Sequence, residues 1–277
     1  MRHALTLPTG GPCADPRFLV ELAERAEGAG WDGVFLEDYV LFQGNPAAPT
    51  CDPWIALAGA ATRTQRILLG TKVTPLARRR PWVVARQAVA IDQLSNGRMV
   101  LGVGLGDVGE HVVRDASFTQ FGEALEPATR AAIFDEGLEV IAGLWTGAPF
   151  AHQGARFRVD EVTFLPVAVQ RPRIPIWVGG GYPNPGATRR AARWDGSMLY
   201  RADQTALTPA DVGAIRAAAG DRAYDVMVSA PRSADAGADA AAIAELEAAG
   251  ATWASVYVPV QEAGDMRRIV ERGPAAR

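Results

Sequence analysis

The chain has 277 residues, a length that suits one (β/α)8 barrel of about 250 residues better than a smaller α/β sandwich. Apolar residues make up 48% and charged residues 21%, which supplies a substantial core and excludes an intrinsically disordered chain. The net charge of −3 argues against nucleic acid as a partner, and no apolar run approaches the ~20 residues of a membrane span.

Strand and helix patterns alternate along the chain. Short apolar runs predict strands at His3–Leu7, Gly33–Glu37, Ile67–Val73, Met99–Val103, Ile174–Val178, Ser197–Tyr200, Tyr224–Ser229 and Trp253–Val258. Capping residues and helical spacing predict helices at Asp15–Ala29, Asp52–Ala61, Pro81–Leu94, Ala128–Leu144, Gly186–Arg193, Pro209–Ala219, Asp239–Ala249 and Glu262–Glu271. The alternating stretch Phe150–Phe164 predicts a small β-excursion before the fifth core strand.

Eight strand–helix units predict a parallel sheet that closes into a (β/α)8 TIM barrel, and we expect residues 1–277 to form one domain. The active site of such a barrel lies at the carboxyl ends of its strands, so residues that directly follow a strand are the candidates. The ends with chemically useful residues are Glu37-Asp38-Tyr39, Thr74-Pro75, Gly104–Asp107 and Gly179–Tyr182.

The stretch Gly102–Asp107 (GVGLGD) carries glycines at alternate positions and ends in an acid. A dinucleotide fingerprint needs a helix that opens at its third glycine, whereas a long segment without clear periodicity follows here. Two interpretations stay open for these glycines. They let a flat ring approach the backbone closely near Gly106, or they make room for bulky neighbours inside the barrel.

The stretch Gly179–Arg193 combines three glycines, a Pro-Asn-Pro turn and a helix that begins near Gly186. Free backbone N–H groups next to a helix N-terminus favour an anion, so we expect a phosphate site here, with Arg189 and Arg190 adding charge. The alternative is an ordinary flexible loop between a strand and a helix.

The acids after the second strand have two interpretations. A carboxylate from Glu37 or Asp38 at the barrel mouth can bind a hydroxyl group or transfer a proton. Alternatively, Glu37 caps the next helix or pairs with the run Arg78–Arg80, which by itself is more typical of a solvated face.

The metal-binding residue types show no ligand spacing. His3, His111 and His152 are scattered, so we expect no metal site. Cys13 and Cys51 fit small buried or loop thiols of a reducing cytoplasm better than a disulfide framework. The N-terminus also lacks the apolar region of a signal peptide, and we therefore expect a cytoplasmic protein.

Six ordered stretches carry a family resemblance: Ala23–Tyr39, Thr71–Asp107, Phe134–Trp145, Phe150–Phe157, Val169–Gly181 and Ala191–Gly196. Together they resemble the bacterial luciferase-like flavin-dependent oxidoreductases. The resemblance implies a (β/α)8 barrel that binds reduced FMN or the deazaflavin coenzyme F420 at its mouth. It extends over about residues 3–200 and does not specify a substrate.

The resemblance also implies roles for single residues. Asp38 is similar to an acid that contacts the cofactor, Thr74 to a residue that borders its ring, and Asp107 to an acid that transfers protons in some relatives. The cofactor-binding set that we expect is Asp38, Thr74, Gly106, Gly179, Gly180, Gly181 and Tyr182. Many relatives have Ser-Asp-His after the second strand, whereas this chain has Glu37-Asp38-Tyr39. Tyr39 can donate a proton but, with an unperturbed pKa of about 10, is a poor base.

The leading expectation is a two-component monooxygenase that uses reduced FMN and O2 on a small organic substrate, with Asp107 and Tyr39 as catalytic residues. Such an enzyme takes its flavin from a separate flavin reductase, and relatives suggest a homodimer. One alternative is an F420-dependent hydride-transfer oxidoreductase, and a second is a non-catalytic flavin-binding barrel. In either of the two enzymes, the cofactor performs the redox chemistry and the protein orients it.

Overall fold

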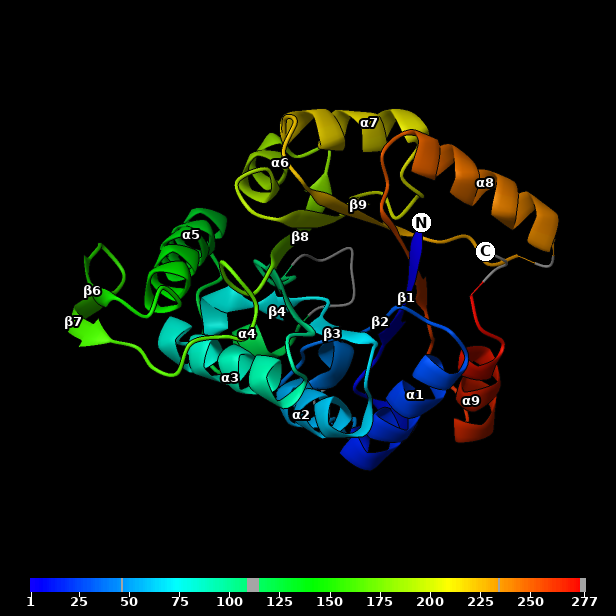
Figure 1. The fold of residues 1–277 in the computed structure, drawn as a ribbon, viewed down its shortest axis with the longest axis horizontal. Coiled ribbons are helices and arrows are strands. Elements are labelled where there is room, and N and C mark those ends of the chain that lie inside the picture. The colour runs from blue at the N-terminus through cyan, green and yellow to red at the C-terminus, as the bar shows by residue number, and fades with distance from the viewer. Residues whose placement is uncertain (46, 109–114, 234, 275–277) are drawn as a thin grey trace.

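The computed structural model describes residues 1–45, 47–108, 115–233 and 235–274. The parallel strands of its barrel are β1 (Arg2–Leu7), β2 (Gly33–Leu36), β3 (Leu68–Thr71), β4 (Thr74–Pro75), β5 (Met99–Gly104), β8 (Ile176–Tyr182), β9 (Gly196–Arg201), β10 (Asp225–Ser229) and β11 (Trp253–Tyr257). They follow the order β3-β2-β1-β11-β10-β9-β8-β5, and β3 pairs with β5 to close the ring. Because β4 continues the line of β3 along β5, the barrel has eight parallel strands, as predicted (Figure 1).

Helices surround this barrel. They are α1 (Pro16–Gly28), α2 (Pro53–Arg63), α3 (Pro81–Leu94), α4 (Ser117–Gln120), α5 (Pro127–Leu144), α6 (Pro185–Ala191), α7 (Pro209–Ala218), α8 (Ala236–Ala248) and α9 (Ala263–Glu271). The predicted caps form, since Asp15 accepts from the Arg17 N–H and Asp52 accepts from the Trp54 N–H. Short 3-10 turns span Gly11–Ala14, Phe42–Gly44 and Leu76–Arg78.

The β-excursion is present between α5 and β8. Strands β6 (Pro149–Gln153) and β7 (Arg158–Thr163) pair antiparallel as a separate two-stranded sheet. In Figure 1 this hairpin lies at the left, away from the barrel. It therefore takes no part in the barrel wall.

An aromatic plug fills the amino-terminal half of the barrel interior. The rings of Phe35 and Trp177 stack with centroids 5.6 Å apart, and Trp253 meets both at centroid distances of 6.2 and 5.5 Å. Ala4, Val100, Met198 and Met227 complete this inner cluster. Since these side chains fill the amino-terminal half, the space for a ligand inside the described barrel lies toward the carboxyl ends of the strands.

Two predicted strand boundaries are wrong, and both errors lie at the barrel mouth. The third strand is not continuous over Ile67–Val73, because Lys72 and Val73 interrupt it between β3 and β4. The fifth strand does not end at Val178: Gly179–Gly181 belong to β8 and pair with β9 as far as Tyr182, before Pro183. A residue with a side chain would crowd Val73 at position 179, because a Cβ on Gly179 would lie only 2.8 Å from the Val73 side chain.

Candidate functional site

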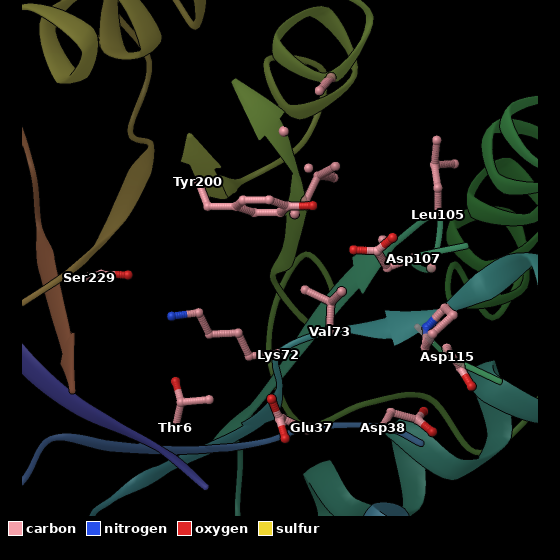
Figure 2. A pocket seen from close by; sticks show the side chains of 18 of the residues that line it. Thr6, Glu37, Asp38, Lys72, Val73, Leu105, Asp107, Asp115, Tyr200 and Ser229 are labelled. Carbon is pink, nitrogen blue, oxygen red and sulfur yellow. The ribbon is translucent and has the colours of Figure 1, made fainter. Parts of the chain in front are cut away.

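A cavity of about 910 Å³ opens at the carboxyl ends of the strands. Its volume falls within the range of about 300–1,000 Å³ that is usual for small-molecule and cofactor sites. Seven of the residues selected from the sequence line it: Asp38, Tyr39, Gly106, Asp107, Gly179, Gly180 and Gly181. Glu37 lines it too, and so do polar residues that the sequence did not single out, among them Thr6, Lys72 and Ser229 (Figure 2). Ser255 is a further lining residue.

Tyr39 stands at the wall of this cavity, half-buried and edge-to-face against the ring of Phe42, with centroids 5.7 Å apart. Burial, and then the nearby carboxylate of Glu37, raise the pKa of its phenol above its usual range. Tyr39 is therefore neutral over the physiological pH range and can act as a hydrogen-bond donor.

Asp107 follows β5 and Gly106, whose φ of +78° favours glycine. Its backbone carbonyl accepts a hydrogen bond of 2.9 Å from the Asp115 N–H. Arg130 on α5 donates hydrogen bonds of 3.1 and 2.6 Å to the carbonyls of Leu105 and Gly106. Burial lowers the pKa of this guanidinium, and the Asp107 carboxylate partly offsets that shift. Leu105 and Gly106, which directly precede Asp107, are thus held in place from α5.

Asp38 is the centre of a buried ion-pair network. Its carboxylate accepts from Arg78 Nη2 at 3.0 Å, Arg79 Nη2 at 2.8 Å, Thr74 Oγ1 at 2.8 Å and Trp54 Nε1 at 3.1 Å. Burial raises the pKa of Asp38, but the two guanidinium groups more than offset it, and the pKa is lowered. The acceptor sites of this carboxylate are thus already used by the protein itself.

This network corrects two expectations about the arginines. Arg78 and Arg79 do not form a solvated face, since their side chains are 3% and 15% exposed. They pair with Asp38 and not with Glu37. Thr74 donates a hydrogen bond to Asp38 and is not among the residues that line the cavity, so its contact with a cofactor ring stays a prediction.

At the predicted flat-ring site, other groups of the protein fill the space beside Gly102 and Gly104. A Cβ on Gly102 would lie 1.8 Å from the Thr71 carbonyl oxygen, and one on Gly104 would lie 2.6 Å from Val73 Cγ2. The packing interpretation therefore explains both positions. Between them, Gly104 and Gly179 make room for Val73, which projects into the cavity mouth.

The predicted phosphate segment differs from the expected open loop. The side chain of Asn184 accepts from the backbone N–H groups of Gly186 and Ala187 at 2.8 and 3.4 Å, so these amides at the start of α6 are already bonded. Arg190 pairs with Asp135 at 2.6 Å. Tyr182 lines a separate, more open pocket of about 710 Å³, and not the main cavity. A phosphate role for Gly179–Gly181 stays a prediction.

Lys72 lines the cavity although the sequence did not single it out, and Glu37, for which two interpretations stayed open, lines the same cavity. Burial lowers the pKa of Lys72 to about 8 and raises that of Glu37 to about 7, while the charge of each partly opposes the shift of the other. One signal was available, because Lys72 is the only lysine of the chain and lies at the end of an apolar strand.

The histidines and cysteines that the structure describes lie in ordinary surroundings. His152 contacts Glu136 at 3.2 Å near the β6–β7 hairpin, and His111 lies outside the described residues. Burial raises the pKa of Cys13 to about 12 and that of Cys51 to about 11, which favours the protonated thiol over the nucleophilic thiolate at neutral pH. Within the described ranges, no group of three or more His, Cys, Asp or Glu side chains could hold a metal ion. No helix in those ranges has the length and apolar character needed to cross a bilayer.

Comparison with known proteins identifies the family of this chain. The sequence profile of the family described as luciferase-like monooxygenase matches residues 1–272. The chain belongs to this family. An F420-dependent glucose-6-phosphate dehydrogenase from Nakamurella multipartita is 35% identical over 181 residues, which cover 64% of this chain and 50% of that protein. The chain spans about half the length of the curated relatives it matches.

Solved structures share the luciferase-like barrel. An F420-dependent secondary alcohol dehydrogenase has a TM-score of 0.75 at 17% identity, over 100% of this chain and 99% of that one. A monooxygenase from Streptomyces bottropensis has a TM-score of 0.73 at 23% identity, over 98% and 96% of the two chains. At these identities the likeness establishes the fold. It does not decide between F420-dependent dehydrogenation and monooxygenation.

Proposed function

We propose that this luciferase-like chain is an oxidoreductase that uses coenzyme F420 to exchange a hydride with a small alcohol or carbonyl compound. The observation that carries the proposal is a cavity at the barrel mouth whose walls hold groups able to exchange protons, in a chain whose curated relatives are named F420-dependent dehydrogenases. These relatives favour the F420 alternative over the two-component FMN monooxygenase that we expected first.

The volume of the cavity is large enough for a cofactor ring with a small substrate beside it. Its volume of about 910 Å³ is at the upper end of the usual range. Val73 forms an apolar ledge, seated where glycines at 104 and 179 leave no Cβ. We propose that Gly179–Gly181, Tyr39 and Asp107 border the coenzyme. When bound, the deazaflavin supplies the hydride acceptor or donor.

The protein's own part is to position, to exclude water and to hold protons. The neutral phenol of Tyr39 would donate a hydrogen bond to the bound molecules, and the carboxylate of Asp107 would accept one. Arg78 also donates to the backbone carbonyl of Asp38, so the ion-pair network fixes the segment that carries Tyr39. A side chain held in this way lowers the cost of orienting the substrate.

When the substrate itself reduces the bound F420, the enzyme needs no separate flavin reductase. That partner therefore belongs to the FMN hypothesis, and the homodimer stays a prediction for both.

The test is a binding titration of the purified chain with F420, FMN and reduced FMN, followed by fluorescence under anaerobic conditions. We expect F420 to bind with a Kd below ~100 μM, which corresponds to more than about 5–6 kcal/mol. Absence of F420 binding refutes the proposal. Binding of reduced FMN alone, with uptake of O2, would restore the monooxygenase interpretation, and F420 binding without turnover of any substrate would indicate a non-catalytic barrel.

A substitution at Gly181 tests the placement of the coenzyme. A Cβ there meets only Ala202 at 3.7 Å, whereas one on Gly180 would come within 3.0 Å of Ala187 and disturb α6. We expect Gly181→Leu to weaken F420 binding at least tenfold with an unchanged melting temperature. Gly213→Leu on α7, where no atom lies within 4 Å of the added Cβ, is the matched control. Equal affinities in the two variants would contradict the placement.

A further inference from the structure

The inner part of the cavity is a polar pocket, formed by Thr6, Glu37, Lys72, Ser229 and Ser255. The hydroxyl groups of Thr6 and Ser255 lie 2.7 Å apart. In Figure 2 the side chain of Lys72 extends into the open space of the cavity, with Glu37 and Thr6 below it and Ser229 beyond its nitrogen. Thr6 follows Ala4, and Ser255 follows Trp253, by two positions along the same strands, so the inner pocket lies next to the aromatic plug on its carboxyl-terminal side.

The ammonium group of Lys72 has no hydrogen-bond partner among the residues that the structure describes. Its direction follows from the break between β3 and β4, because adjacent residues of a regular strand point to opposite faces. Here Lys72 and Val73 both line the cavity. The amine therefore faces the open space of the cavity, where it can donate a hydrogen bond to a bound molecule.

Glu37 is the charge that acts on this amine. It comes from the end of β2, and its carboxylate holds the pKa of Lys72 above the value that burial alone would produce. Gln43 Nε2 contacts the same carboxylate at 3.5 Å. With pKa values of about 8 and about 7, the amine and the carboxyl can both gain and lose protons near neutral pH, as acid–base catalysis requires.

The other titratable groups around the cavity are less suited to this task. Arg78 pairs with the carboxylates of Asp38 and Asp115 at 3.0 and 3.1 Å. The phenols of Tyr200 and Tyr257 have raised pKa values, because burial disfavours their charged form. In Figure 2, Val73 stands between Lys72 and Asp107.

We propose that Lys72, assisted by Glu37, is the catalytic acid–base residue that exchanges a proton with the oxygen of a small alcohol or carbonyl substrate. The inference rests on the proposed F420-dependent function. In oxidation, the O–H bond of the alcohol breaks and its proton passes to the neutral amine of Lys72. The C–H bond breaks as well, its hydride passes to oxidised F420, and the C–O bond becomes double. In the reverse direction the ammonium returns the proton.

A chemical test exploits the fact that Lys72 is the only lysine. The native protein is labelled with trace acetic anhydride at a series of pH values, and acetylation of the Lys72 peptide is measured by mass spectrometry. We expect a midpoint near pH 8, below the ordinary value of about 10.4 for lysine. Glu37→Gln should lower the midpoint, because it removes the negative charge that stabilises the ammonium, while Glu37→Asp should keep it. A labelling midpoint above about pH 10, or an unchanged midpoint in Glu37→Gln, contradicts the proposed pairing of Lys72 with Glu37.

A kinetic test uses oxidised F420 with propan-2-ol, cyclohexanol, glucose and glucose 6-phosphate as probes. We expect Lys72→Ala to lower kcat at least about 100-fold with unchanged F420 affinity, and added ethylamine to restore part of the rate. Lys72→Arg should not restore it, because a guanidinium does not give up its proton. If the wild type oxidises no probe, the proposed function fails and this inference with it. If the wild type is active and Lys72→Ala keeps its rate, while Asp107→Asn loses it, only this inference fails.

Discussion

The buried carboxylate of Asp38 allows a sharp prediction, because the structure makes it a part of the scaffold and the family resemblance makes it a cofactor contact. It binds two guanidinium groups, a hydroxyl and an indole N–H, all within 3.1 Å. Replacement by alanine would leave the guanidinium of Arg78, only 3% exposed, with Asp115 as its one remaining carboxylate. We therefore expect Asp38→Ala to act on stability before it acts on binding.

The expected cost follows from the loss of one partner of a buried ion pair. Such a loss costs about 3–5 kcal/mol, because the remaining charge stays buried without compensation. At roughly 2–4 °C per kcal/mol for chains of this size, the melting temperature should fall by roughly 6–20 °C. The pKa of Asp38 is lowered in the folded state, so its contribution is present above the unfolded pKa and is lost as the pH falls. The difference between wild type and variant should therefore shrink below about pH 4.

The measurement is thermal unfolding followed by circular dichroism from about pH 3 to 8, without cofactor. Asp160→Ala is the matched control, because Asp160 pairs with Arg158 at 2.9 Å while both side chains are more than 70% exposed. Exposed pairs contribute little, so its melting temperature should equal that of the wild type. A wild-type melting temperature in Asp38→Ala, combined with lost F420 affinity, would refute the reasoning and make Asp38 a direct cofactor contact.

Three further predictions concern the barrel. Since the pKa of Glu37 is raised to about 7 in the folded state, the stability of the wild type should fall as the pH rises from about 4.5 to 7. In thermal unfolding scans over this range, Glu37→Gln should become steadily more stable relative to the wild type. Phe35→Ala should cost about 3–5 kcal/mol in urea unfolding, whereas Phe121→Ala, at a position 60% exposed, should be nearly neutral; equal effects would contradict the aromatic plug. Gly104→Ala should lower the free energy of unfolding by about 1–3 kcal/mol, and Val73→Ala in the same chain should recover part of this loss. If the effects of the two substitutions simply add, the contact between residues 104 and 73 is contradicted.

The sequence predicted the barrel well because its signals are local. Apolar runs and helical spacing place all eight core strands and the helices between them within a few residues. The caps at Asp15 and Asp52 form as expected, since a carboxylate next to the first free N–H groups needs no long-range contact. The order of strands then follows from the rule that parallel strands are joined by helices.

The candidate site was less predictable, because its interactions join residues that are far apart in the chain. Asp38 and Arg78 are separated by 40 positions, and no local pattern reveals which of Glu37 and Asp38 pairs with the arginines. Likewise, the glycines of the GVGLGD stretch read equally well as room for a ring or for a side chain. Only the structure shows that Val73 fills the space beside Gly104.

Lys72 shows how a departure from pattern can indicate function. A charged residue inside an apolar strand contradicts the expectation for a buried strand, and folds keep such conflicts mainly at functional sites. Burial of the amine is unfavourable, yet it brings the pKa of Lys72 down to about 8, where a proton moves readily in either direction. The same break that turns Lys72 inward seats Val73 on the glycines of two neighbouring strands. One irregular dipeptide therefore supplies both an apolar ledge and a titratable group to the same cavity, and a variant that straightened this strand would lose both together.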